Sequence, residues 1–461
     1  MSKFAAGHRA DPDIGPDFDI GRAIDAGRWS GYQKLVLLLV GCAVIFDGFD
    51  NQSLGFAAPA IIRDWGISKE MLSPVMAIGQ FGMMFGAALG GMIGDRFGRK
   101  AALVGSVLTF GVLTGCIAFS NSLFVIGALR LVANIGLGAA FPNAAALVSE
   151  YTPARNRSLG VTASIVCVPL GGVVGGLIAA QVLPIFGWRM LFAAAGGATL
   201  TVALLLFLCL PESTRFLLRR HGDTPKLRRL LARVGLDVPA NARLVDIAEQ
   251  DEGQHGKSPL AALFSGAWRR DTIALWAAFG ACLFAVYTAF SWLPTMLSDA
   301  GFDLAFSSQG LTAFNIGGVI AALTGAWLIG HKGSKAPMVV MAIGGVLGAG
   351  VLLTNPLDPA GSRLVLILIL GIEGAFINGV QTTLYALAAN VYPTAIRATG
   401  VGSATSVGRI GAIASSFGGA LALHALGASG LSLMLLVAMG ATAIALMSVR
   451  RHFQPAHSNG V

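Results

Sequence analysis

Apolar and polar positions fall along the chain in alternating blocks, and the apolar blocks recur from residue 34 to residue 448. Each block approaches the roughly 20 residues needed to cross about 30 Å of hydrocarbon, and Gly, Pro, Asn and charged clusters bound the blocks. The pattern predicts an all-α integral membrane protein with twelve transmembrane helices. Their predicted ranges are 34–60, 73–93, 101–119, 123–148, 159–183, 189–210, 272–297, 308–330, 337–354, 363–389, 399–423 and 428–448.

One long polar segment divides these helices into two sets of six. The predicted organisation is a cytoplasmic N-terminal tail (1–33), a six-helix bundle (34–210), a cytoplasmic linker (211–270), a second six-helix bundle (271–448) and a cytoplasmic tail (449–461). The linker contains the basic string RFLLRRHGDTPKLRRLLARVG and the acidic string EQDEG. We interpret it as partly an amphipathic helix, solvated near anionic lipid in preference to serving as a binding module.

Two pairs of similar strings indicate an internal repeat. YTPARNRSLG (151–160) matches VYPTAIRATG (391–400) at a spacing of 240 residues, and GGMIGDRFGRK (90–100) matches GAWLIGHKGSK (325–335) at 235. Within its own half, each string connects equivalent predicted helices. The strings at 90–100 and 325–335 connect the second and third helices, and those at 151–160 and 391–400 connect the fourth and fifth. Two six-helix halves of the same orientation form the parallel repeat found in rocker-type secondary transporters.

The composition indicates that the chain is embedded in a lipid bilayer. Of the 461 residues 55% are hydrophobic and 12% are charged, about half the charged fraction of a soluble domain. The net charge of +9 is compatible with nucleic-acid binding, but Lys and Arg sit in short clusters between apolar blocks, as orientation signals do. If both termini are cytoplasmic, only six of the 32 Lys and Arg residues lie outside the cytoplasmic segments. Arg63, Lys69, Arg189 and Arg363 lie on the outer side of the membrane, and Arg130 and Arg409 lie within spans.

Several other classes of protein are disfavoured. The first thirty residues lack the apolar core of a signal peptide, so we expect the first membrane helix to act as the targeting signal. The five cysteines lie in apolar blocks without metal-like spacing. No HExxH, GxSxG or histidine cluster is present. We therefore expect no enzyme activity, no metal, no cofactor and no nucleic-acid partner.

Short motifs carry a family resemblance over roughly residues 30–450. GDRFGRK (94–100) and PESTRFLL (211–218) resemble two loop motifs of the major facilitator superfamily. DGFD (47–50), RLVANIGLGAAFPN starting at Arg130, and YPTAIRATGVG followed by GRIGAI around Arg409 resemble the aromatic acid:proton symporter family. The resemblance implies the major facilitator fold. We expect a monomer in a bacterial inner membrane. Family members usually carry an acidic residue in the loop after the eighth helix, where this chain has IGHKGSK. A charge pair of the cytoplasmic gate that depends on this acidic residue is therefore not supported.

Intramembrane acids are candidate proton-coupling groups because a charge in the bilayer is costly. Asp47 and Asp50 lie three residues apart, about one helical turn, and burial beside each other favours retention of a proton. Gly48 between them would let another helix approach closely. The alternative is a pair of solvated acids at the outer end of the helix. Glu373 is either a second protonation site or an ion-pair partner of Arg409.

Arginine and neutral side chains within the spans are candidate substrate ligands. The planar fork of Arg409 suits bidentate capture of a carboxylate, the role that the resemblance also implies. Its alternative is a structural ion pair with an intramembrane acid, of which Glu373 is one candidate. Arg130, a functional position in the family, faces Asp47 or Asp50 or else anchors its helix at the interface. Further candidates for hydrogen bonding or ring stacking, each with packing as its alternative, are Asn315, Gln381, Tyr385 and Trp292.

Charged loop residues form a candidate cytoplasmic gate. The set consists of Asp95, Arg96, Arg99, Glu150, Arg157 and Arg397. Charge pairs that form in one state and break in another give an element whose populations a ligand can shift. The alternative is that these charges only set membrane orientation.

The predicted function is proton-coupled uptake of an aromatic carboxylate by alternating access. Two alternatives remain open: a proton-coupled antiporter that exports an amphiphilic compound, and a transporter-like sensor that signals through residues 211–270. Pocket shape decides among benzoate, hydroxybenzoates and chlorinated aromatic acids, and the motifs do not encode that shape.

Overall fold

The computed structural model describes residues 16–246, 262–266, 268–355 and 357–453. The predicted tails and linker therefore lie partly outside the described residues, and EQDEG lies outside them entirely. Ten described helices are long and apolar enough to cross a membrane. They are α2 (Gly31–Trp65), α3 (Lys69–Phe97), α4 (Arg99–Ile117), α5 (Leu123–Tyr151), α6 (Ala154–Cys209), α11 (Arg269–Asp299), α12 (Leu304–Lys332), α13 (Lys335–Thr354), α14 (Arg363–Val391) and α15 (Thr394–Ser448).

Two of these helices are each interrupted by one glycine. α6 and α15 contain 56 and 55 residues, which at 1.5 Å per residue is about 80 Å, more than twice the hydrocarbon thickness. Gly187 (φ 72°) and Gly427 (φ 60°) are non-helical, a left-handed conformation that glycine adopts without a Cβ penalty. Each of the two therefore consists of two helical segments, and both breaks fall where the sequence predicts short loops.

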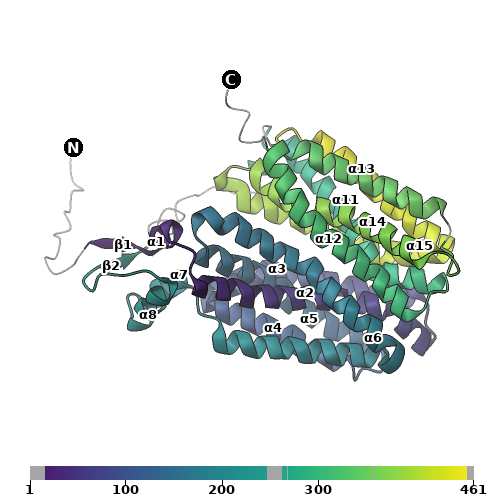
Figure 1. Cartoon of the computed structure of the whole chain (residues 1–461), viewed down its shortest axis with the longest axis horizontal. Helices are drawn as coiled ribbons and strands as arrows, with labels where there is room; N and C mark the ends of the chain where they lie inside the picture. The colour runs from purple at the N-terminus through teal and green to yellow at the C-terminus, as the bar shows by residue number, and fades with distance from the viewer. Residues whose placement is uncertain (1–15, 247–261, 267, 356, 454–461) are drawn as a thin grey trace.

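The helices form two bundles that lie side by side, α2–α6 and α11–α15 (Figure 1). Within the first, α2 packs on α6 and α3 on α5; within the second, α11 packs on α15 and α12 on α14. Between the bundles, α6 meets α12, α3 meets α15 and α2 meets α11. Gly48 allows α2 and α6 to touch, because a Cβ placed there would lie 2.1 Å from the Val168 carbonyl oxygen. The predicted close approach at Gly48 is confirmed.

The described residues of the N-terminal tail, and those of the linker up to residue 246, fold together against one end of the first bundle (Figure 1). They contain β1 (Asp17–Asp19), α1 (Ile20–Ala26), α7 (Thr214–His221), α8 (Pro225–Val234) and β2 (Arg243–Val245), with β1 and β2 paired in parallel. The leucines of α8 pack in a small core with Ile20, Leu217 and Leu244. The predicted amphipathic helix is present as α8, but its apolar face packs against other residues of the tail and linker and not against lipid. We call this end of the molecule the α7 end.

Candidate functional site

A cavity of about 580 Å³ lies between the two bundles, within the size range of small-molecule sites. Helices α2, α3, α5 and α6 line one side, and α11, α14 and α15 line the other. The lining is therefore shared by both halves of the chain.

The cavity is displaced toward the α7 end. Helices α3 and α5 run toward that end, and their lining residues, between 83 and 88 and between 137 and 142, lie from the middle of each helix onward. Helix α15 starts at that end and lines the cavity with residues between 401 and 409, before its break at Gly427. Among the described residues, none that lines the cavity from these three helices lies in the half of its helix at the opposite end.

Contacts between the bundles close the opposite end. Lys69 Nζ lies 2.6 Å from Asp299 Oδ2, and the next residue, Glu70, has its Oε1 2.9 Å from His424 Nδ1. We call these two pairs the outer latch. Deeper in the interface, Gln52 and Asn315 exchange two amide hydrogen bonds of 3.2 and 2.8 Å. The latch could not be predicted from the sequence, because its residues are charges next to loops and belong to no distinguishing motif.

Arg409 is held in the cavity wall by one edge of its guanidinium. Its Nη1 donates to Tyr287 Oη at 2.6 Å and to Gln80 Oε1 at 3.4 Å. The Tyr287 hydroxyl also accepts from Asn51 Nδ2 at 3.2 Å. Within the described residues, no hydrogen bond engages Arg409 Nε or Nη2. The guanidinium thus keeps donors for a further acceptor.

Asp47 lines the same cavity from α2. Its Oδ1 is buried without a hydrogen-bond partner among the described residues. The carboxyl group and the Arg409 guanidinium lie close enough to interact electrostatically. One acid and one cation from different bundles therefore line the same cavity.

Aromatic and neutral polar side chains complete the lining. Tyr287 and Phe290 pack edge to face with ring centroids 5.8 Å apart, and both line the cavity with Tyr385. Gln381 and Thr382 line it from α14. The predicted residues Gln381, Tyr385, Arg409 and Asp47 are thus brought together by the fold. Asn51 and Gln80 were missed, although a polar residue inside an apolar block is a usable signal.

Asp50 lies outside the cavity lining and pairs with Arg130. Its Oδ2 is 3.2 Å from Arg130 Nη1, and Thr114 Oγ1 donates to its Oδ1 at 2.5 Å. Arg130 also donates from Nη1 and Nη2 to the Asp50 carbonyl oxygen. Asp50 is 1% and Arg130 3% exposed. Asp47 and Asp50 therefore have different surroundings, and Arg130 is buried, so it is not an interfacial anchor.

Glu373, Asn315 and Trp292 lie outside the cavity. Glu373 is buried on α14 with no partner for either oxygen among the described residues. It points toward α13, where a Cβ on Gly348 would lie 1.9 Å from its Oε2. The pair of Glu373 with Arg409 is not formed. Asn315 is occupied by Gln52, and Trp292 packs where Gly419 leaves room.

Comparisons with known proteins decide the family. Residues 40–416 match the profile of the Major Facilitator Superfamily. The chain belongs to this superfamily. This facilitator is 38% identical over 416 residues to the 4-hydroxybenzoate transporter PcaK of Pseudomonas putida, covering 90% of this chain and 92% of that protein. It is 35% identical over 440 residues to the gallate transporter of the same species, covering 95% and 96%.

Solved structures agree on the fold. The inward open conformation of the xylose transporter XylE from E. coli superposes on this facilitator with a TM-score of 0.67 at 16% identity, covering 91% of this chain and 97% of that one. The predicted superfamily is confirmed, and with it the expectation of a multi-pass membrane transporter and not an enzyme.

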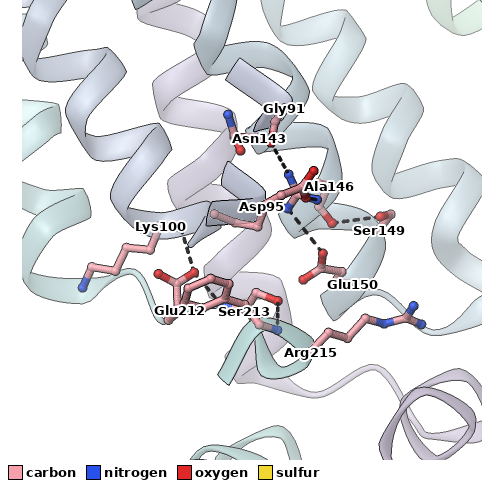
Figure 2. Close-up of polar contacts among 12 residues, drawn as sticks. Gly91, Asp95, Lys100, Asn143, Ala146, Ser149, Glu150, Glu212, Ser213 and Arg215 are labelled. Carbon is pink, nitrogen blue, oxygen red and sulfur yellow. Dashed lines mark hydrogen bonds and ion pairs between the residues drawn. The ribbon is translucent and has the colours of Figure 1, made fainter. Parts of the chain in front are cut away.

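Three of the six predicted gate residues meet at the α7 end of this facilitator. Arg99 Nη2 lies 2.5 Å from Asp95 Oδ1, and Arg99 Nε lies 3.8 Å from Glu150 Oε1. Glu212, which the gate prediction omitted, accepts from the Lys100 backbone N–H at 2.9 Å (Figure 2). These contacts tie α3, α4 and α5 to the segment before α7. We call Asp95, Arg99 and Glu150 the inner cluster.

Among the described residues, no ion pair joins the other three predicted gate residues to the inner cluster. Arg157 pairs with Asp25 of α1 and donates from Nε to the Ser149 carbonyl oxygen at 3.0 Å. Arg397, in the second bundle, donates from Nε to the Tyr392 carbonyl oxygen at 3.3 Å. Arg96 lies over the Phe97 ring at 5.4 Å. The six residues do not form one gate in this conformation.

Proposed function

We propose that the chain is a proton-coupled symporter that takes up an aromatic carboxylate by alternating access. In this proposal α6 and α15 each cross the bacterial inner membrane twice, giving twelve spans in two parallel repeats. The α7 end and both termini are cytoplasmic, as the distribution of Lys and Arg favours. The observation that carries the proposal is one cavity lined by Arg409, Asp47 and aromatic rings, in a chain whose relatives include 4-hydroxybenzoate and gallate transporters.

The substrate carboxylate is proposed to bind the unoccupied edge of Arg409. Nε and Nη2 together form a donor fork that suits a carboxylate. The aromatic ring would then pack against Tyr287, Phe290 and Tyr385. Gln381 and Thr382 offer hydrogen bonds to a ring hydroxyl. Neutral and aromatic contacts of this kind fix orientation, while the guanidinium selects the anion.

Charge balance in the cavity couples the proton to the substrate. Of the described residues, one cation, Arg409, and one acid, Asp47, line the cavity. A bound carboxylate adds a negative charge to a space where uncompensated charge is costly. A proton taken up by Asp47 restores the balance, so anion and proton bind together more readily than either does alone. No cofactor takes part, and the proton gradient supplies the energy.

Alternating access requires the bundles to separate at one end as they close at the other. The cavity at the α7 end and the latch at the other end are the features of an inward-facing state. Arg409 on α15 contacts Gln80 on α3, so a substrate at Arg409 acts on a contact between the bundles. The inner cluster is proposed to change partners when the α7 end closes.

The test is uptake of labelled 4-hydroxybenzoate by proteoliposomes that contain the full chain. An acidic exterior is expected to accelerate entry into the wild type. Asp47→Asn is expected to retain exchange of unlabelled for labelled substrate, yet its net uptake should fall to the rate seen without a pH gradient. Substrate efflux driven by the same gradient would instead indicate an antiporter, and full gradient stimulation in Asp47→Asn would remove this residue from the proton path.

Breaking the outer latch is expected to shift the population toward the outward-facing state. The variant is Lys69→Gln with Glu70→Gln, and spin labels at Arg63→Cys and Ala360→Cys, in a background without the five native cysteines, report the separation of the bundles. Longer distances should gain population. The control is Arg363→Gln, which breaks the 3.1 Å pair with Asp303 inside the second bundle and should leave the distances unchanged. Equal effects of both changes would contradict the latch.

A further inference from the structure

A second groove, separate from the central cavity, lies on the outer surface of the second bundle at the α7 end. It has a volume of about 560 Å³ and runs between the start of α11 and the end of α15. Alanines form its floor, and two isoleucines stand at its edges, Ile273 at 53% and Ile444 at 64% exposure. The small residues are Ala274, Ala277, Ala441 and Ala445. Apart from Arg269, Arg270 and Ser448, the lining is therefore apolar.

Two arginines stand at one end of this groove. Arg269 and Arg270 both line it and are both exposed. Arg270 Nε donates to the Ser448 carbonyl oxygen at 3.2 Å, which holds its side chain over the end of α15. No ion pair engages either guanidinium within the described part of the chain. The first backbone N–H groups of α11 begin at the same place and also favour an anion.

The nearby acid does not neutralise these two arginines. Asp271 accepts from the Arg450 backbone N–H at 2.7 Å, and its Oδ2 lies 3.9 Å from Arg451 Nε. Arg451 in turn stacks over the Trp268 ring at 3.5 Å. Asp271 is buried, so its charge is engaged on the α15 side. The groove therefore keeps a net positive entrance.

We propose that this groove binds an anionic phospholipid of the cytoplasmic leaflet, with the phosphate at Arg269 and Arg270 and an acyl chain along the alanines. The charge complementarity favours an anionic over a zwitterionic head group, and basic pockets between membrane helices are suited to such head groups. The apolar floor would have no role in binding a free phosphate. This inference does not depend on what the central cavity carries.

The test measures binding of phosphatidylglycerol to the purified full-length protein by native mass spectrometry, beside phosphatidylcholine with the same acyl chains. Arg269→Gln with Arg270→Gln is expected to weaken phosphatidylglycerol binding by roughly 30-fold, the effect of two basic side chains near an anionic head group. The control is Arg229→Gln with Arg233→Gln, two exposed arginines of α8 away from the groove, which should leave binding unchanged.

A second variant, Ala277→Phe, tests the apolar part of the site and serves as the test if the double arginine variant does not fold. The phenylalanine side chain fills the apolar part of the groove while both arginines remain, and it should weaken phosphatidylglycerol binding. Glycerol 3-phosphate should not compete. The proposal is overturned if phosphatidylcholine binds as tightly, if glycerol 3-phosphate displaces the lipid, or if Ala277→Phe binds phosphatidylglycerol like the wild type.

Discussion

Arg409→Lys is expected to raise the KM for a labelled aromatic carboxylate by about 10- to 100-fold, because lysine keeps the charge but loses the planar fork. A hydrogen bond to a charged group contributes about 1.5–3 kcal/mol, and one such bond is lost in the change. Arg409→Gln removes the charge as well, and its effect should be larger. Uptake by proteoliposomes at varied substrate concentration measures both changes.

Two controls separate substrate binding from a structural role of Arg409. Arg363→Lys makes the same substitution at an exposed pair on the opposite end and should leave the KM unchanged. Tyr287→Phe removes the acceptor of the 2.6 Å bond that holds Arg409, and it should raise the KM less than Arg409→Lys does. An unchanged KM in Arg409→Lys would contradict the proposed carboxylate fork.

The bundle of membrane helices could be predicted because it depends on the length of apolar runs. Even the breaks at Gly187 and Gly427 fall in predicted loops. Strands β1 and β2 could not be predicted, since two strands of three residues more than 220 residues apart carry no measurable periodicity. The folded tail and linker follow from tertiary contacts of α8, whose pattern specifies an apolar face but not what covers it.

The helical rotation between neighbouring candidates explains which of them reach the cavity. Asn378, Gln381, Thr382 and Tyr385 follow the spacing i, i+3, i+4, i+7 and line it together. At about 100° per residue, Glu373 is rotated about 140° from Asn378, and Trp292 about 160° from Phe290. Both therefore face away. The sequence contained this information, but in a helix buried on several sides it does not say which face meets the cavity.

Contacts between the two bundles could not be predicted from the sequence. Lys69 with Asp299, and Gln52 with Asn315, are each separated by more than 200 residues. The sequence around each of these residues does not indicate which distant residue it contacts. The inner cluster was partly predictable because its members belong to recognisable loop motifs, whereas the link of Arg157 to Asp25 required the fold of the N-terminal segment.

Arg130→Gln is expected to destabilise the protein by about 3–5 kcal/mol, because it leaves Asp50 buried without its cation. Arg130→Gln with Asp50→Asn removes both charges and should recover much of that loss, a coupling that thermal unfolding of the purified variants measures. Thr114 keeps a hydrogen bond to the amide in the double variant, since its hydroxyl already contacts this side chain at 2.5 Å. The matched single change at the cavity, Asp47→Asn, removes an acid without a direct ion pair and should alter stability far less.

The same double variant decides which aspartate carries the proton. Asp50 is enclosed by Arg130 and Thr114 and does not line the cavity, whereas Asp47 does. If Asp47 carries the proton, the folded double variant should still be accelerated by an acidic exterior, because its proton site is intact. A double variant that is stable but no longer responds to the pH gradient would assign the proton to Asp50, and one as unstable as Arg130→Gln alone would show that the buried pair does more than neutralise charge. The pairing of Asp50 with Arg130 then fixes α2 against α5, and this leaves Asp47, about 60° away on the same helix, as the acid free to respond to the substrate.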